Sequence, residues 1–133
     1  MVTRKWLVAI VDDELDIVNL FKDALSEIKG ISVFTFTDPI IALEHFRSNR
    51  RKYALIISDL RMPGLSGGEL ISTIKKENPL VRTLLMTAFD LNDPVFEEYR
   101  EKEIVNDFLQ KPIGLKDLRS MVEKQLILYK FGG

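Results

Sequence analysis

Short apolar runs alternate along the chain with longer segments in which apolar residues recur every three or four positions. The runs are rich in β-branched and aromatic residues and end at Gly, Pro or acidic residues, which is typical of buried strands. We assign five strands to Trp6–Val11, Ile31–Thr37, Tyr53–Ser58, Val81–Met86 and Ile104–Leu109. The intervening segments have helical spacing. Because strands that alternate with helices pair in parallel, we expect an α/β sandwich with helices on both faces of the sheet.

Capping signals place the ends of the expected helices. Asp16 is predicted to cap the first helix, whose apolar residues run from Ile17 to Ile28 and which Gly30 closes. An acidic cap followed by proline starts the second helix at Asp38-Pro39. The second helix is expected to end at about Arg47, the third to span Glu69–Asn78, and the fourth to start at Asn92-Asp93-Pro94. The last helix is recognised by an apolar face made of Leu115, Leu118, Val122, Leu126 and Tyr129.

The composition excludes several classes of protein. The 133 residues suit one domain, residues 1–133, with a core of about 5–129. Without cysteine there is no disulfide, thiol catalysis or thiolate metal site, and a single histidine, His45, supports neither a multi-histidine zinc site nor a Ser/His/Asp triad. A net charge of −1 gives no reason to expect contact with nucleic acid or an anionic membrane. No apolar run reaches membrane-spanning length, so we expect a cytoplasmic protein.

Residues with reactive or charged side chains stand where the apolar runs end. Asp12 and Asp13 follow the first run, Asp59 ends the third, Thr87 follows the fourth, and Lys111 stands just after the fifth. The carboxyl ends of parallel strands lie on one edge, so these side chains can converge. We expect a flavodoxin-like (βα)5 doubly wound sandwich with a parallel five-stranded sheet in the order 2-1-3-4-5. In that order the first and third strands flank the crevice in which ligands bind.

The residue types at this edge favour phosphoryl chemistry. Crowded carboxylates raise one another's pKa unless a cation lies among them. Ligation by oxygen alone, without histidine or cysteine, suits Mg²⁺, which keeps several waters and shares phosphate oxygens. Lys111 adds a positive charge and Thr87 adds a hydroxyl donor. Together with one nucleophilic carboxylate, these groups can neutralise the oxygens of a transferring phosphoryl group.

Four motifs at these strand ends are similar to those of one family. They are V-D-D-E at Val11–Glu14, D-L-R-M-P-G at Asp59–Gly64, M-T-A at Met86–Ala88 and F-L-Q-K-P at Phe108–Pro112. In this order, and with each at a strand end, they resemble the receiver domain of two-component response regulators, the CheY-like superfamily. The resemblance covers nearly the whole chain, from about Lys5 to Tyr129.

The resemblance implies specific roles for the metal and phosphoryl ligands. Asp59 would be the phosphoacceptor, which takes a phosphoryl group from the phosphohistidine of a sensor histidine kinase or a phosphotransfer protein. Asp12, Asp13, Asp59 and the backbone carbonyl of Arg61 would bind Mg²⁺. Two further residues, Thr87 and Lys111, would contact the phosphoryl oxygens.

The resemblance also implies a conformational switch. Phe108 matches an aromatic residue that turns inward when Thr87 moves toward the phosphate, and the Lys111–Pro112 bond matches one that is cis in the family. Phosphorylation would then alter the surface of the fourth helix, fifth strand and last helix, which a second copy or an output domain could bind. The surplus of apolar residues in Leu126–Gly133 fits either a frayed chain end that packs on its own domain or a contact surface of this kind. The chain departs from the family in lacking a glycine before the fifth strand, where Glu101-Lys102-Glu103 predicts a different turn.

Other functions remain as alternatives at this point. A Mg²⁺-dependent phosphohydrolase of the haloacid dehalogenase-like group would need a second acid two residues after its nucleophile, where this chain has Arg61. A flavodoxin-like cofactor binder would need a glycine-rich loop after the first strand, which is absent. A receiver-like module that no longer accepts phosphate is disfavoured by the intact set of site residues. We expect a signalling module that catalyses only its own phosphorylation and slow dephosphorylation, not an enzyme; the sequence identifies neither the kinase nor the output.

Two further features are assigned no function. His45 lies on the second helix, and we expect a partly exposed side chain without a role. The basic stretch from Arg47 to Lys52 is interpreted as a solvated helix end.

Overall fold

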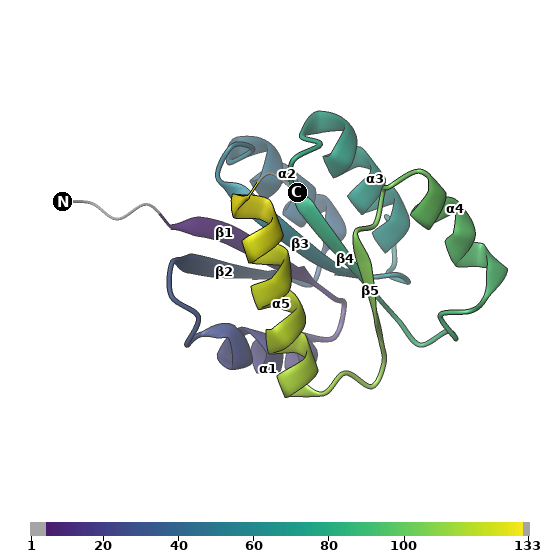
Figure 1. Cartoon of the computed structure of the whole chain (residues 1–133), viewed down its shortest axis with the longest axis horizontal. Coiled ribbons are helices and arrows are strands. Elements are labelled where there is room, and N and C mark those ends of the chain that lie inside the picture. Colours follow the sequence, from purple (N-terminus) through teal and green to yellow (C-terminus); the bar gives the residue numbers. More distant parts are fainter. Residues whose placement is uncertain (1–4, 132–133) are drawn as a thin grey trace.

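A single parallel sheet forms the centre of the computed structural model, which describes residues 5–131 (Figure 1). Its five strands lie in the order β2-β1-β3-β4-β5, which confirms the predicted flavodoxin-like topology. The strands are β1 (Trp6–Val11), β2 (Ile31–Phe36), β3 (Tyr53–Asp59), β4 (Arg82–Thr87) and β5 (Asp107–Gln110). The helices are α1 (Leu15–Leu25), α2 (Pro39–Ser48), α3 (Gly67–Glu77), the 3₁₀ helix η1 (Pro94–Phe96), α4 (Glu97–Glu101) and α5 (Leu115–Lys130).

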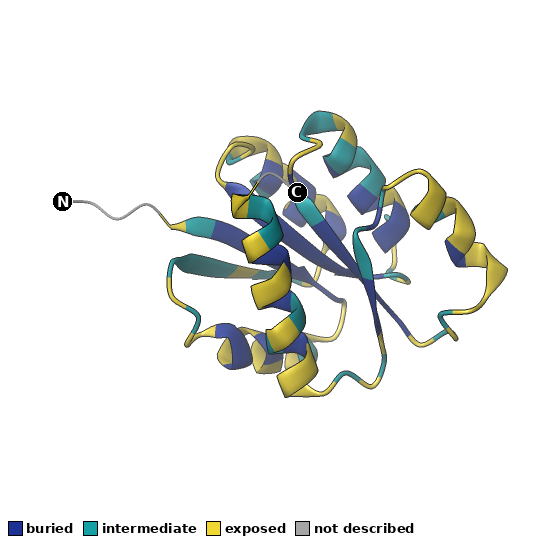
Figure 2. Cartoon of the chain, in the orientation of Figure 1, coloured by how far each residue is buried: buried dark blue, intermediate teal, exposed yellow. Residues whose placement is uncertain are grey.

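Helices cover both faces of the sheet. α1 and α5 pack on one face over a core that includes Ile57, Leu84 and Val122, while α2, α3 and α4 cover the other (Figure 1). All seven residues of β3 are buried, whereas the edge strand β2 has no fully buried residue (Figure 2). A central strand that is covered on both faces must be apolar throughout, which explains the unbroken apolar runs in the sequence. Within residues 5–131 no helix has a stretch long and apolar enough to span a bilayer.

The first helix differs from its predicted boundaries at both ends. It begins at Leu15, and Asp16 lies inside its first turn rather than capping it. The N-cap residue is Glu14, whose side chain forms no capping bond. The carboxylate of Asp12 accepts a hydrogen bond of 3.0 Å from the backbone N–H of Glu14, in the turn before the helix. The helix ends at Leu25, and Gly30, with φ +85°, belongs to the turn that leads into β2. The apolar Ile28 therefore packs against the core from a turn and not from the helix.

Other element ends also moved by a few residues. α3 starts at Gly67, two residues before the prediction, since the Ser66 hydroxyl accepts from Glu69 N–H at 3.2 Å. The predicted cap Asp38 is confirmed, and its carboxylate accepts from Ile40 N–H at 2.9 Å. β5 is shorter than predicted because it pairs with β4 only from Asp107 onward.

The last helix buries a face different from the predicted one at two positions. Leu115 is 41% exposed, although it was predicted to belong to the apolar face. The polar Gln125, which was not predicted to belong to this face, is buried on it, and its amide oxygen accepts a hydrogen bond of 2.8 Å from Arg82. At the end of the helix Tyr129 packs edge-on against Trp6, whereas Ile127 and Phe131 are 57% and 83% exposed. Gly132 and Gly133, which belong to the predicted contact surface, lie outside the described residues.

Two features without an assigned function contribute to packing. His45 is partly exposed, as predicted, and its Nδ1 shares a hydrogen bond of 2.7 Å with the hydroxyl of the fully buried Tyr53. The expectation that His45 has no functional role stays a prediction. Arg47 and Arg50, predicted to be solvated, both form ion pairs with Glu77 at 2.8 and 2.7 Å and connect α2 to α3.

The turn before β5 has the geometry that glycine usually provides. Glu103 adopts φ +54°, the left-handed conformation that L residues avoid. Its N–H donates to the carbonyl of Arg100 at 3.2 Å, and Ile104 N–H donates to Tyr99 at 3.2 Å, the two bonds of a Schellman helix end. The prediction of a different turn was therefore wrong, because the chain forms a glycine-type turn with a glutamate in it.

Replacing this glutamate by glycine should stabilise the protein. We expect Glu103→Gly to raise the free energy of unfolding by about 0.5–1 kcal/mol. The substitution removes a left-handed strain of about 1–2 kcal/mol from the folded protein, and the larger conformational entropy of glycine in the unfolded chain offsets part of this gain. Chemical denaturation measures the change. Glu103→Ala is the control, since alanine keeps the strain; an equal gain in both variants would contradict this explanation.

Candidate functional site

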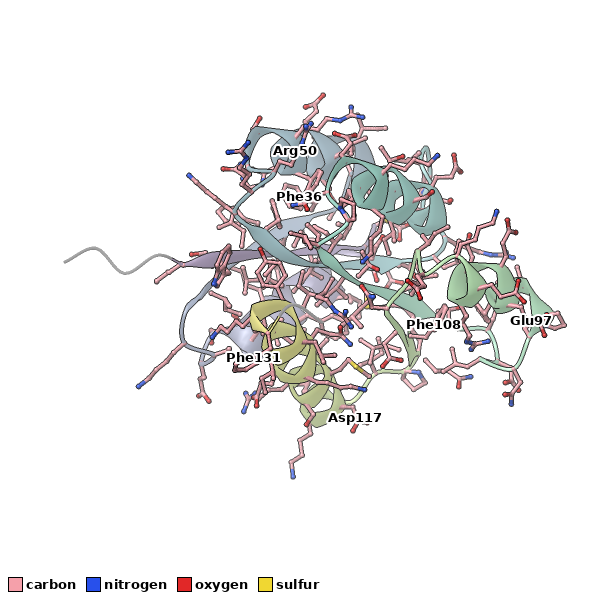
Figure 3. All side chains as sticks on the ribbon, turned by 45° about the horizontal axis from the view of Figure 1, so that its top comes forward. Phe36, Arg50, Glu97, Phe108, Asp117 and Phe131 are labelled. Atoms are coloured by element: carbon pink, nitrogen blue, oxygen red, sulfur yellow. The ribbon has the colours of Figure 1, made fainter. Side chains whose placement is uncertain are left out.

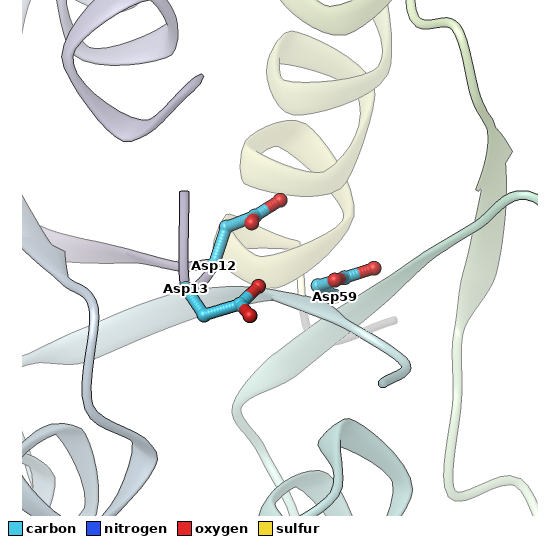
Figure 4. A group of neighbouring side chains, drawn as sticks. All are labelled: Asp12, Asp13 and Asp59. Carbon is cyan, nitrogen blue, oxygen red and sulfur yellow. The ribbon is translucent and has the colours of Figure 1, made fainter. Parts of the chain in front are cut away.

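Three aspartates meet at the carboxyl edge of the sheet. Asp12 and Asp13 follow β1, and Asp59 ends the neighbouring strand β3 (Figure 4). One carboxylate oxygen from each lies within 4.8 Å of the other two. Asp12 is fully buried and Asp59 is 9% exposed, while Asp13 is exposed. The predicted cluster of carboxylates is therefore present, with one member open to solvent.

Lys111, which follows β5 at the same edge of the sheet, contacts two of these acids. Its Nζ donates to Asp12 Oδ2 at 3.0 Å and lies 3.2 Å from Asp59 Oδ1. The residue follows β5, and its N–H donates to the carbonyl of Thr87 at 2.7 Å, which continues the pairing with β4. The Lys111–Pro112 peptide bond is cis. One ammonium group is thus shared between two buried carboxylates.

Burial and charge act in opposite directions on these groups. Burial raises the pKa of Asp59, Lys111 lowers it, and the charges of Asp12 and Asp13 raise it again, with a net upward shift. For Lys111, burial lowers the pKa, but the hydrogen bond to Asp12 and the charge of Asp59 outweigh it, so the pKa is raised. Lys111 therefore stays protonated at neutral pH, and Asp59 is a more basic carboxylate than an exposed aspartate.

Thr87 and Lys111 face the same cavity as Asp59. This cavity has a volume of about 370 Å³, and both residues line it. Thr87 ends β4 and is 2% exposed; its Oγ1 accepts a hydrogen bond of 3.0 Å from the N–H of Phe89. The hydroxyl proton is thereby left to point to another acceptor. The predicted set of Asp59, Thr87 and Lys111 therefore lies around one space.

Sequence reasoning missed two side chains at this cavity. The guanidinium of Arg61 lies 4.4 Å from the centre of the Phe89 ring, and both residues line the cavity beside Asp59. The sequence assigned Arg61 a role only through its backbone. Phe89 stands one residue after the M-T-A motif, and that position was the only signal available for it.

Gly67 is a second omission. A Cβ atom at this position would collide with the backbone carbonyl oxygen of Asp59. The N–H of Gly67 donates to the carbonyl of Leu60 at 2.9 Å, which holds the start of α3 against the end of β3. A residue without a side chain is therefore required for the close approach of α3 to the backbone of Asp59.

The donor set at the cluster fits Mg²⁺. Ligands at about 2.0–2.1 Å from an octahedral ion lie at most about 4.2 Å apart, close to the separation within the cluster. All three acids offer oxygen, which a hard cation prefers. Asp12, Asp13 and Asp59 are thus the residues that would hold the ion; the backbone carbonyl of Arg61 as a further ligand stays a prediction.

Phe108 lies on β5, next to α4 (Figure 3). The ring is 8% exposed and packs edge-on against Phe96, with the ring centres 5.2 Å apart. The guanidinium of Arg100, on α4, lies 4.8 Å from the centre of the Phe108 ring. The aromatic residue is thus in contact with η1 and α4, as a switch residue would need to be, while the switch itself stays a prediction.

The fold and the acidic cluster define a phosphoacceptor module of the CheY-like type. Residues 8–123 match the response regulator receiver domain family, and the chain belongs to this family. It is a receiver domain of the kind found in response regulators, which work with histidine kinases and output domains.

Two curated relatives and one solved structure illustrate the similarity. The chain is 28% identical over 127 residues to the DNA-binding transcriptional regulator NtrC of Escherichia coli, which covers 96% of this chain and 26% of the relative. It is 27% identical over 121 residues to the sporulation initiation phosphotransferase F of Bacillus subtilis, covering 91% of this chain and 94% of the relative. A receiver domain protein from Clostridium thermocellum superposes with a TM-score of 0.82 at 27% identity, covering 96% and 99% of the two chains. The chain thus spans about a quarter of the regulators it matches, such as NtrC.

Because the pKa of Asp59 is raised, we predict that Asp59→Asn increases the stability of the metal-free protein toward unfolding, by an amount that depends on pH. The folded protein binds the Asp59 proton more tightly than the unfolded chain, so its stability falls as the pH rises through the two pKa values. Above that range the ionised carboxylate destabilises the fold, and the amide removes the effect. We expect Asp59→Asn to unfold at higher denaturant concentration than the natural protein at pH 7 in EDTA, with the difference shrinking toward pH 3.

Added Mg²⁺ should reverse this order, because it binds only the natural cluster and stabilises it by mass action. Equal stability of the two proteins at pH 7 in EDTA would contradict the assigned electrostatics.

Proposed function

We propose that Asp59 accepts a phosphoryl group from a phosphohistidine of a sensor histidine kinase or a phosphotransfer protein. The observation that carries this proposal is the position of Lys111, whose ammonium lies 3.2 Å from Asp59 and 3.0 Å from Asp12 at a cavity that Thr87 also lines. A nucleophilic carboxylate with a cation and a hydroxyl around one space is the arrangement that phosphoryl transfer requires.

The transfer proceeds by attack of an Asp59 carboxylate oxygen on the phosphorus. The new P–O bond forms as the P–N bond to the imidazole breaks, and the electron pair of that bond stays on the imidazole nitrogen. Lys111 and Thr87 contact the phosphoryl oxygens from their places on the cavity wall. Asp12, Asp13, Asp59 and the Arg61 carbonyl would hold Mg²⁺, which would further neutralise the charge of these oxygens.

The acyl phosphate on Asp59 is removed by hydrolysis at the same site. Water attacks the phosphorus and releases phosphate, which restores the Asp59 carboxylate. The chain therefore acts only on itself and turns over no separate substrate, so we do not class it as an enzyme. We propose that residues 1–133 act as one receiver domain in the cytoplasm, with a core of about residues 5–129.

The output of phosphorylation is a change at the α4-β5-α5 surface. Thr87 moves toward the phosphoryl group and Phe108 adjusts its packing beside α4. The apolar side chains of Ile127, on α5, and Phe131, just after it, are exposed, and they offer a contact for a second copy or an output domain. A second function, aspartyl phosphohydrolysis with an acid two residues after the nucleophile, is not supported, because Arg61 at that position stacks on Phe89.

Intact-mass measurement tests the proposal. The protein is incubated with a small phosphodonor and Mg²⁺, and we expect the gain of one phosphoryl group. Asp59→Asn should gain none, since the amide is not a nucleophile, and EDTA should prevent the gain in the natural protein. No adduct, or an equal adduct in Asp59→Asn, would refute the proposal.

The lifetime of the acyl phosphate should depend on Phe89. Its ring lies with Arg61 on the wall of the cavity beside Asp59 and limits the access of water. We expect Phe89→Ala to shorten the half-life of the phosphorylated protein several-fold after the donor is removed, as followed by intact mass. Phe131→Ala is the matched control, because that ring is 83% exposed on α5. Equal half-lives of natural and Phe89→Ala protein would show that the ring does not shield the phosphate.

A further inference from the structure

A second and larger cavity lies at the opposite end of the strands from Asp59. It has a volume of about 890 Å³ and is bounded by the end of α3, the end of α4 and the first residues of β4 and β5. Five cationic side chains line it: Lys75, Lys76, Arg82, Arg100 and Lys102. Two acidic residues, Glu103 and Asp107, lie in the same lining. Cations thus outnumber acids in a protein whose net charge is −1.

Lys75 is the one partly buried lysine in this lining, since Lys76 and Lys102 are exposed. Its half-buried ammonium donates one hydrogen bond, at 2.9 Å, to the amide oxygen of Asn106. That oxygen already accepts from the N–H of Thr83 at 2.8 Å. In the described part of the chain no carboxylate lies within ion-pair distance of Lys75. A partly buried charge without a counterion is unfavourable, so the site would be stabilised by an anion.

The electrostatics of Lys75 agree with this geometry. Burial and, to a smaller extent, the charge of Arg82 lower its pKa, the charge of Glu103 partly offsets them, and the resulting pKa is about 8. The ammonium therefore remains mostly charged at neutral pH. An anion that binds beside it would raise this pKa again.

Two arginines in the lining are held by neutral groups. Arg82 Nε donates to Gln125 Oε1 at 2.8 Å, and Arg100 donates to the carbonyl of Leu91 at 2.6 Å. These bonds fix the guanidinium groups without neutralising their charge. Lys76 is exposed and forms no ion pair among residues 5–131, whereas Lys102 pairs with Glu98 at 2.6 Å. Most of the positive charge is therefore available to a ligand.

We propose that this cavity binds a small molecule that carries two or more phosphate groups. Phosphate oxygens accept hydrogen bonds from lysine and arginine with the geometry that such a set of donors offers. The volume falls within the range of small-molecule sites, about 300–1,000 Å³. Pro79 and the largely exposed Leu80 form an apolar part of the lining, which suits the non-phosphate part of the ligand. A recessed ammonium such as Lys75 is better reached by a compact anion than by an acidic protein surface.

The position of the cavity connects such a ligand to the signalling surface. Phe108 also lines it, and the Arg100 guanidinium lies 4.8 Å from the centre of that ring. Asn106, the acceptor for Lys75, is bonded through its N–H to the carbonyl of Thr83 at 2.9 Å, at the start of the β4–β5 pair. A bound anion therefore contacts the residues through which α4 and β5 are held together.

Calorimetric titration with inorganic pyrophosphate tests the proposal on the full chain, in EDTA so that no metal is present. We expect a dissociation constant below about 1 mM. Lys75→Gln should weaken binding about ten-fold, the effect of one charged hydrogen bond, and Glu103→Gln should strengthen it. Lys22→Gln is the matched control, because it removes the same charge from α1 on the other face of the sheet. Asp59→Asn should bind as the natural protein does, which separates this site from the phosphoacceptor.

Three results would overturn the proposal. The first is that 10 mM pyrophosphate does not bind, and the second is that Lys22→Gln and Lys75→Gln lose the same affinity for pyrophosphate. The third is that a polyglutamate peptide binds and pyrophosphate does not, which would indicate a protein partner. If Lys75→Gln does not fold, Lys76→Gln, at an exposed position, takes its place with the same control. We then expect the affinity for pyrophosphate to fall several-fold. An unchanged affinity in Lys76→Gln would then count against the site.

Discussion

The ammonium group of Lys111 is the interaction on which the functional edge of this protein depends. It balances the charge of the fully buried Asp12 and of Asp59, at 3.0 and 3.2 Å. Without it, two carboxylates would lie close together in a partly dehydrated site, and one of them would take up a proton. The shared ammonium balances the charge of both acids and lowers the pKa of Asp59, so that they can bind a divalent cation and Asp59 can act as a nucleophile. Burial still leaves the pKa of Asp59 raised, so the ionised site is less stable than an uncharged one would be.

The sheet makes this meeting possible through its strand order. β1 and β3 are neighbours, so their carboxyl ends bring together acids that stand 47 residues apart (59 − 12). Lys111 reaches them from beyond β5, two strands away from β3, with a long side chain. The opposite ends of β4 and β5 carry the basic cavity, where the charge balance is reversed. The two ends of the same strands are therefore suited to opposite ligands, a cation with a phosphoryl group at one and an anion at the other.

Much of this arrangement was predictable from the sequence, and the failures have physical reasons. The unbroken apolar run of β3 predicted a buried central strand, and the reactive residues at strand ends predicted the site edge. Side chains whose place depends on their surroundings were not predictable: Asp16 lies inside the first turn of α1 and does not cap it, and Gln125 takes a buried position where it accepts a hydrogen bond from Arg82. Phe89 and the side chain of Arg61 define the cavity only through their mutual contact. Glu103 shows that a missing glycine does not imply a missing glycine turn.

The rate of phosphorylation of Lys111→Met tests the central claim most directly. The substitution keeps the length of the side chain and removes its charge, and the rate is measured with a small phosphodonor at saturating Mg²⁺. If the shared ammonium stabilises the transferring phosphoryl group, the rate should fall by at least about 100-fold, the loss typical of one preorganised charge-stabilising donor. A rate within about two-fold of the natural protein would contradict the role of Lys111 and, with it, the proposed organisation of the site.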